Sequence, residues 1–313
     1  MPARTPLLDQ LRTGKKQSDA ILQPVVDKWL VEHGDTLSAY DESDWSALRD
    51  LMTRGPRRRR RVFSPSAATL CRRRLVIDKY RDLRPIPLKD ARYSKIFDDG
   101  RWRHFRWQMT FFKMGIVESM EIFHTLGDLE YGGSYDVVAR LMINGKMRRV
   151  LIDIKGVHAS KFNGIQFSGK PEESNRVQVC IYMHLNNIKI GILWYENKNT
   201  QETCEIVIRR DATYHRIIRR YIRRQKYMRR YVEAGAFPKE ECDVSGRSNE
   251  FQRCPQRNNC LCLPVQLVLE DGEVVKVGEP RRNSKEKRFL RRNTLPLSEL
   301  EGFRGARKVH SKI

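Results

Sequence analysis

The stretch GSYDVVARLMINGKMRRVLIDIKG, residues 133–156, predicts a β-hairpin with acidic side chains at its open end. Asn144-Gly145 separates two apolar runs, and this dipeptide is the strongest short-range signal for a tight hairpin turn. Asp136 opens the first strand and Asp153 stands near the end of the second. Partly buried charges are costly unless something compensates them. The hairpin therefore predicts a site at which two carboxylates meet.

Lys155 should share this site, because alternate residues of a strand point to the same face and Lys155 follows Asp153 by two. Two carboxylates suit a hard divalent cation such as Mg²⁺, which prefers oxygen ligands. A neighbouring lysine can orient a water molecule beside a phosphate. Taken alone, however, the triplet DIK at 153–155 is explained better by a strand-end salt bridge.

The charge of the chain points to a polyanionic partner. Among 313 residues, 61 Lys and Arg outnumber 38 Asp and Glu, for a net charge of +23. Such an excess favours nucleic acid over a membrane surface, since no long apolar span or lipidation motif is present. Without a secretory h-region at the N-terminus, we expect a reducing cytoplasm (the host's, if the chain is viral), where the seven cysteines would stay unpaired.

The chain divides into three regions: a helical region with a polybasic run over 1–61, a middle region over 62–265, and a small hairpin with a basic tail over 266–313. The expected elements of the middle region are a capped helix from Ser64 that carries Cys71, helices over 98–115 and 172–187, strands over 188–196 and 203–210, and a helix over 212–232.

The helix over 212–232 combines an apolar stripe with a dense set of cations. A solvated face is the simpler explanation, but few acids compensate these charges, which favours a phosphate contact. The candidate nucleic-acid contacts are Arg219, Arg220, Arg223, Arg224, Arg229 and Arg230. The polybasic run Arg54–Arg61 is explained equally well as a solvated linker or a phosphate-contacting arm.

Four short motifs resemble, in order, those of the PD-(D/E)XK nucleases, in particular the RecB-like branch that includes AddB and the CRISPR-associated adaptation exonucleases. They are GRWRH at 100–104, GSYD at 133–136, DIK at 153–155 and QVCIY at 178–182. Each motif is common by chance. Their conjunction, in order and on the expected element types, is specific.

The resemblance implies a restriction-endonuclease-like α/β core, a mixed central sheet with flanking helices, over about residues 62–265. It implies one or two Mg²⁺ or Mn²⁺ ions, with ligands from His104, Asp136, Asp153 and the backbone carbonyl of Ile154. Lys155 would orient the attacking water and stabilise charge in the transition state. Gln178 and Tyr182 would position the phosphate backbone of the strand being cut.

Part of this branch carries a [4Fe–4S] cluster held by one cysteine before the histidine motif and three after the last motif. The resemblance assigns these places to Cys71, Cys242, Cys254 and Cys260, with Cys262 as a rival ligand. The family's C-x2-C spacing is absent, so ligand identity is open. A four-cysteine zinc site is the alternative, since spacing alone does not separate the two. Cys180 and Cys204 are expected to be free thiols.

The resulting hypothesis is a metal-dependent DNA exonuclease that acts on single strands or DNA ends in recombination, repair or replication. A small, basic nuclease without helicase motifs also suits a virus or mobile element. An endonuclease or junction resolvase on the same fold is the first alternative. A non-catalytic nucleic-acid-binding protein with a structural zinc site is the second.

Overall fold

The computed structural model forms two compact units, each built from two segments of the chain. Unit 1 comprises residues 1–68 and 91–220, and unit 2 comprises residues 69–90 and 221–313. The structure describes residues 20–33, 41–44, 46, 63–79, 91–126, 131–239, 241–242, 252–269 and 271–278. The polybasic run over 54–61 and the basic tail after 278 lie outside these residues.

The predicted hairpin forms the centre of unit 1. Strand β4 (Val137–Ile143) pairs antiparallel with β5 (Lys146–Val157), and Ile143 faces Lys146 across the turn. Asn144 and Gly145 both have positive φ, 51° and 68°, as the predicted tight turn requires. Asp136 directly precedes β4 instead of opening it.

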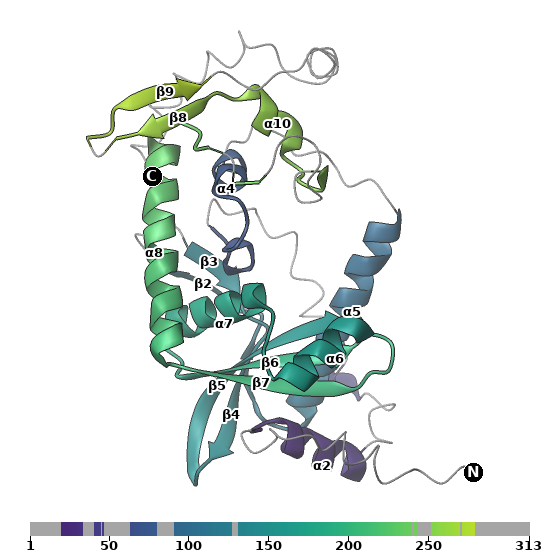
Figure 1. Cartoon of the computed structure of the whole chain (residues 1–313). Coiled ribbons are helices and arrows are strands. Elements are labelled where there is room, and N and C mark those ends of the chain that lie inside the picture. The colour runs from purple at the N-terminus through teal and green to yellow at the C-terminus, as the bar shows by residue number, and fades with distance from the viewer. Residues whose placement is uncertain are drawn as a thin grey trace. The chain divides into compact units, whose positions relative to one another are not determined.

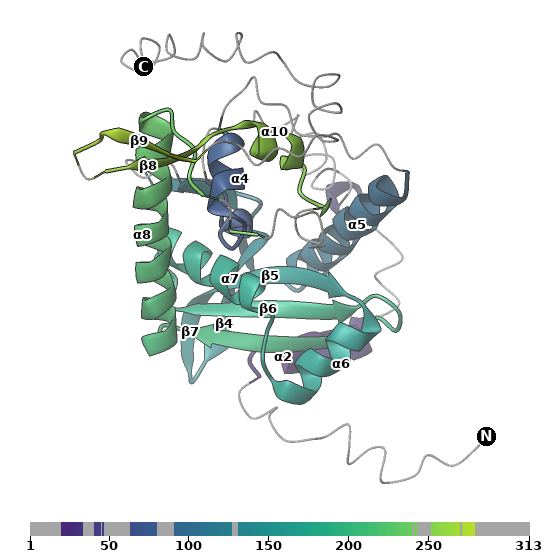
Figure 2. The ribbon, with the colours of Figure 1, turned by 45° about the horizontal axis from the view of Figure 1, so that its top comes forward.

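Three further strands complete a mixed five-stranded sheet in the order β1-β4-β5-β6-β7, of which β4, β5, β6 and β7 are labelled in Figure 2. They are β1 (Val117–Met120), β6 (Ile190–Asn197) and β7 (Thr203–Arg209). β5 and β6 run parallel and are joined through two helices, α6 (Ala159–Ser168) and α7 (Glu173–Leu185), whereas the other pairs are antiparallel. A separate ribbon pairs β2 (Phe123–Leu126) with β3 (Tyr131–Ser134).

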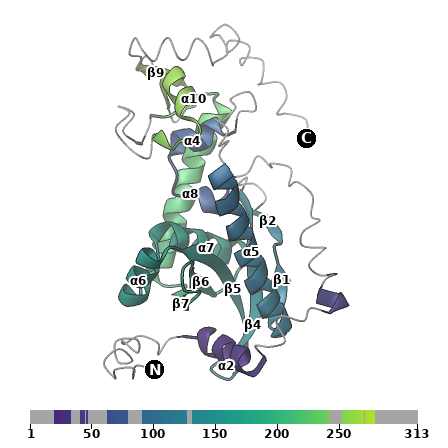
Figure 3. The ribbon, with the colours of Figure 1, turned by 90° about the vertical axis from the view of Figure 1, so that its right-hand side faces the viewer.

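Helices cover both faces of the sheet (Figure 3). On one face, Trp107 and Phe111 of α5 (Ala91–Lys113) pack with α2 (Gln23–His33) against Ile152 and Ile154. The other face carries α7, and a side chain at Gly191 of β6 would collide with α7. Strand residues alternate, so Asp153 lies on the α7 face while its neighbours fill the α5 face.

Two expectations about local structure are wrong. No helix was expected between β5 and the helix over 172–187, but this segment contains α6. It begins after His158, whose side chain accepts a hydrogen bond from the Ser160 N–H, and ends at Gly169 with φ 62°. The single helix expected from Ser64 is broken into a short turn, Pro65–Ala67, and α4 (Arg72–Ile77). Cys71 therefore precedes α4 with an extended backbone instead of lying on a helix.

Unit 2 contains α4, α10 (Arg257–Cys262) and the predicted C-terminal hairpin, β8 (Val265–Val268) with β9 (Val274–Gly278) (Figure 1). The long basic helix α8 (Ala212–Glu233) runs from unit 1 into unit 2, and Asp211 caps it by accepting the Tyr214 N–H at 2.7 Å. Among the described helices, none has the length and apolar composition needed to cross a membrane.

Candidate active site

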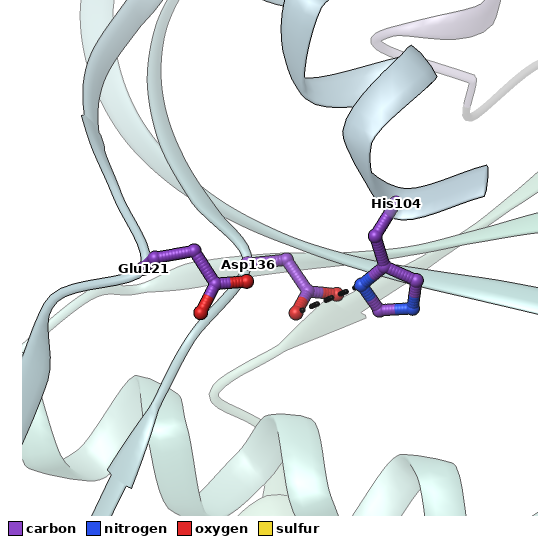
Figure 4. A group of neighbouring side chains, drawn as sticks. All are labelled: His104, Glu121 and Asp136. Carbon is purple, nitrogen blue, oxygen red and sulfur yellow. Dashed lines mark ion pairs between the residues drawn. The ribbon is translucent and has the colours of Figure 1, made fainter. Parts of the chain in front are cut away.

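Asp136 lies at the centre of the site and is 9% exposed. Its Oδ2 accepts the Ile154 N–H of the neighbouring strand at 2.7 Å, which fixes the carboxylate against β5. Its Oδ1 lies 3.3 Å from Nδ1 of His104, which reaches the site from α5 (Figure 4). The structure thus brings the histidine of the first motif to the aspartate of the second.

Asp153 is fully buried and is held by two different partners. Lys155 Nζ lies 2.8 Å from Oδ2, and Gln178 Nε2 of α7 donates to Oδ1 at 3.2 Å. The buried carboxylate thus has the Lys155 ammonium beside one oxygen and the Gln178 amide beside the other. Asp153 and Lys155 of β5 therefore lie beside Gln178 of α7, so the third and fourth motifs meet in the folded chain.

Gly133 explains why the second motif starts with glycine. A Cβ atom at this position would lie 2.8 Å from Cδ of Pro65 and 3.0 Å from the ring and hydroxyl of Tyr182. The missing side chain lets the buried Tyr182 ring approach the β3 backbone. Burial raises the pKa of Tyr182, and the two aspartates raise it further, so its hydroxyl stays protonated and can donate a hydrogen bond.

The charges of the site are strongly linked. Burial raises the pKa of Asp153 to about 6. Lys155 lowers this pKa, but the negative charge of Asp136 raises it again. Burial also opposes ionisation of Asp136, yet His104, Lys155 and the Ile154 N–H hold its pKa below the ordinary value. The aspartates in turn raise the pKa of His104 and of Lys155 despite burial. Two adjacent carboxylates with opposite shifts form a site that favours uptake of a proton or a cation.

Glu121 is a member of the site that the sequence did not reveal. Ligand atoms of His104, Glu121 and Asp136 all lie within 4.8 Å of one another, the one such group among the described His, Cys, Asp and Glu residues. Glu121 follows β1 with φ 53°, a conformation rare outside glycine. No motif marks this residue, so only the folded chain identifies it. Asp153, which sequence analysis placed among the ligands, is not in this group.

The four cysteines assigned by resemblance line one cavity of unit 2. The cavity measures about 50 Å³ and is bordered by Leu70, Cys71, Arg74, Cys242, Cys254, Gln256 and Cys260. Burial raises the pKa of Cys254. The side chain of Cys262 lies outside the described part of the chain. Cys180 and Cys204 are elsewhere, in unit 1, and burial raises the pKa of both thiols to about 12.

Arg73 supports this cavity from inside unit 2 and is 0% exposed. Its Nε lies 3.2 Å from Sγ of Cys260. The rest of the guanidinium donates to five backbone carbonyls, those of Phe237, Pro238, Cys260, Leu263 and Pro264. Arg73 of α4 is thereby bound both to the Cys260 sulfur and to the backbone of the segments around it.

The candidate phosphate contacts of α8 separate into two sets. Arg219, Arg220 and Arg223 are exposed. Within unit 2, Arg224 donates to the Leu70 carbonyl and Arg230 to those of Val268 and Leu269, while Arg229 pairs with Glu233 at 2.7 Å. The first set is therefore available to a ligand, whereas the second set already has protein partners.

Comparison with known proteins gives faint structural likenesses. No family model and no curated protein matches the chain. A solved structure of a protein designated SSO0001 aligns with 21% identity and TM-score 0.34 over 64% of this chain and 85% of that one. The alkaline exonuclease LHK-Exo from Laribacter hongkongensis aligns with 12% identity and TM-score 0.37 over 62% of this chain and 94% of that one. Its complex with dAMP aligns with 13% identity and TM-score 0.35 over 56% of this chain and 91% of that one. TM-scores below 0.5 do not establish a shared fold.

Proposed function

We propose that this chain is a divalent-metal-dependent DNA exonuclease of the PD-(D/E)XK type. The observation that carries the proposal is the convergence of four separate sequence motifs on one buried site. His104 contacts Asp136, Asp136 is bound to the strand that carries Asp153, and Asp153 contacts both Lys155 and Gln178. A strand-end salt bridge would explain Lys155 but not the histidine and glutamine.

The donor set fits a hard divalent ion. Carboxylate oxygens and one imidazole nitrogen are suitable ligands for such an ion. Bound here, Mg²⁺ or Mn²⁺ would lower the pKa of a water molecule and offset the charge of the scissile phosphate.

The protein's own residues would orient the reaction. Lys155 donates toward the attacking water and the developing phosphate charge, and Asp153 holds its ammonium in place. Gln178 and Tyr182 lie on adjacent turns of α7, where both can donate to the backbone of the strand being cut. The exposed cations of α8 supply the sequence-independent attraction for the rest of the DNA.

The exonuclease proposal is tested with end-labelled linear and covalently closed circular single-stranded DNA. The wild type with Mg²⁺ is expected to degrade the linear substrate and spare the circle. Asp153→Asn is expected to bind DNA with unchanged affinity and to degrade neither. Cutting of the circle would replace the exonuclease with an endonuclease, and equal activity in Asp153→Asn and wild type would refute the active site.

We further propose that Cys71, Cys242, Cys254 and Cys260 hold a [4Fe–4S] cluster. Four sulfur ligands around one cavity suit either a cluster or zinc. The larger cluster would join α4 to the chain around α10, segments that are far apart in the sequence. Anaerobic purification with a visible spectrum and metal analysis tests this: absorbance near about 400 nm with iron and sulfide supports a cluster. A colourless protein with stoichiometric zinc would replace it.

A further inference from the structure

Glu121 faces the proposed metal site from a separate segment, between β1 and β2 (Figure 4). The Asp136 carboxylate lies between the Glu121 carboxylate and the His104 ring, and ligand atoms of all three fall within 4.8 Å of one another. Around Mg²⁺, with bonds of about 2.1 Å, ligand atoms are about 3.0 Å apart when adjacent and about 4.2 Å apart when opposite. The three side chains therefore need only small shifts to share one ion.

A buried amide fixes Glu121 in this position. Gln108, which is 4% exposed, lies one turn after His104 on α5. Its Nε2 donates to Glu121 Oε1 at 3.1 Å and to the Asp136 backbone carbonyl at 3.2 Å. The Glu121 N–H donates to that same carbonyl at 3.2 Å. Helix α5 thus supplies a candidate ligand and, one turn later, the group that orients two others, as outer-shell partners do in metal sites.

Glu118 shows what an ordinary acid in the same segment does. It lies on β1, where its two carboxylate oxygens pair with Arg140 and Arg149, both at 2.8 Å. Glu121, three residues later, is instead directed toward another carboxylate. Bringing two carboxylates together is unfavourable in a poorly solvated site unless a cation joins them.

We infer that Glu121 is a ligand of the divalent cation, together with His104 and Asp136, and that Gln108 positions it. The inference rests on the proposed function, since it concerns the same site. The ion would then lie between α5 and the start of β4. Asp153 would contact that ion, or a second ion, from the side of Lys155.

Mn²⁺ binding to the full chain, measured by electron paramagnetic resonance without DNA, tests the assignment. Glu121→Gln is expected to weaken Mn²⁺ at least about tenfold, since even outer-shell changes cost 10–100-fold. Glu118→Gln, which removes the same charge from the same segment, should leave the affinity unchanged. The metal-free melting temperature of Glu121→Gln should not fall, because repulsion with Asp136 is relieved, whereas the rise in melting temperature with Mn²⁺ should shrink.

Wild-type Mn²⁺ affinity in Glu121→Gln would overturn the inference. Should that variant not fold, Glu121→Asp replaces it: the shorter carboxylate is expected to weaken Mn²⁺, and wild-type affinity would again overturn the assignment. The assignment of Glu121 as a ligand and the proposed nuclease activity can be refuted independently of each other. Glu121-dependent Mn²⁺ binding without DNA hydrolysis would refute the nuclease and retain the ligand. Hydrolysis that requires Asp153, with Mn²⁺ affinity independent of Glu121, would do the reverse.

Discussion

Replacing Asp153 with asparagine should stabilise the metal-free protein at pH 8 while it abolishes DNA hydrolysis. Asparagine has nearly the shape of a protonated aspartic acid and can still accept the hydrogen bond from Gln178. It lacks the charge that the buried site disfavours beside Asp136. Activity and stability should therefore change in opposite directions.

The magnitude follows from the pKa of Asp153, which burial raises from 3.8 to about 6. Between these values the folded state keeps a proton that the unfolded state has lost. The stability that this proton contributes is present below the unfolded pKa and is lost as the pH rises through about 6. A shift of about 2 units corresponds to roughly 3 kcal/mol at pH 8, which is the most that Asp153→Asn can recover.

Urea unfolding in EDTA, at pH 5 and at pH 8, measures this effect. The advantage of Asp153→Asn should be about half of its full value at pH 5 and should approach the full value at pH 8. Added Mg²⁺ should reduce the advantage by stabilising the wild type more than the variant. Asp98→Asn, at an exposed surface pair with Arg101, is the control and should change stability by less than about 0.5 kcal/mol. A metal-free Asp153→Asn less stable than wild type at pH 8 would refute the reasoning.

Three further changes test other parts of the structure. Arg73→Met should lower the free energy of unfolding by about 3–5 kcal/mol in urea titrations, because it leaves buried acceptors unpaired, whereas Met at the exposed Arg220 should have little effect. Trp102, 60% exposed on the helix that carries His104, should stack on DNA bases. Trp102→Ala is expected to weaken single-strand binding in EDTA by about 1–3 kcal/mol by fluorescence anisotropy, and Phe167→Ala is its exposed control. Glu205→Ala should cost about 1–3 kcal/mol in thermal unfolding, since its carboxylate accepts three backbone N–H groups at the start of α2; an unchanged melting temperature would contradict this.

Local chemistry allowed the centre of unit 1 to be predicted from sequence. The Asn144-Gly145 turn has one favoured geometry, so the pairing of β4 with β5 followed from a dipeptide and two apolar runs. The basic helix α8 was likewise predicted from its apolar stripe and its cations. The motif order then indicated which distant side chains join Asp136, although their contacts form only in the folded chain.

Other features depend on tertiary contacts that no local pattern records. Arg73 stands among three consecutive arginines and resembles a surface cation, yet its guanidinium is enclosed by carbonyls from far along the chain. Trp102 and Trp107 share one aromatic-rich helix, but the first is exposed and the second packs against Trp194. Glu121 belongs to no motif, and its approach to Asp136 depends on Gln108 of another element.

The attachment of Asp136 has a consequence for how such a protein can evolve. Its backbone carbonyl accepts hydrogen bonds from the Gln108 amide and from the Glu121 N–H, so these neighbours are held by the main chain of Asp136 and not by its side chain. One nucleotide change converts an aspartate codon to asparagine, which would remove the carboxylate charge and leave those two bonds intact. If the proposed exonuclease function is correct, a catalytically inactive descendant could thus arise in one step, still fold and still bind DNA ends, and so protect them from degradation.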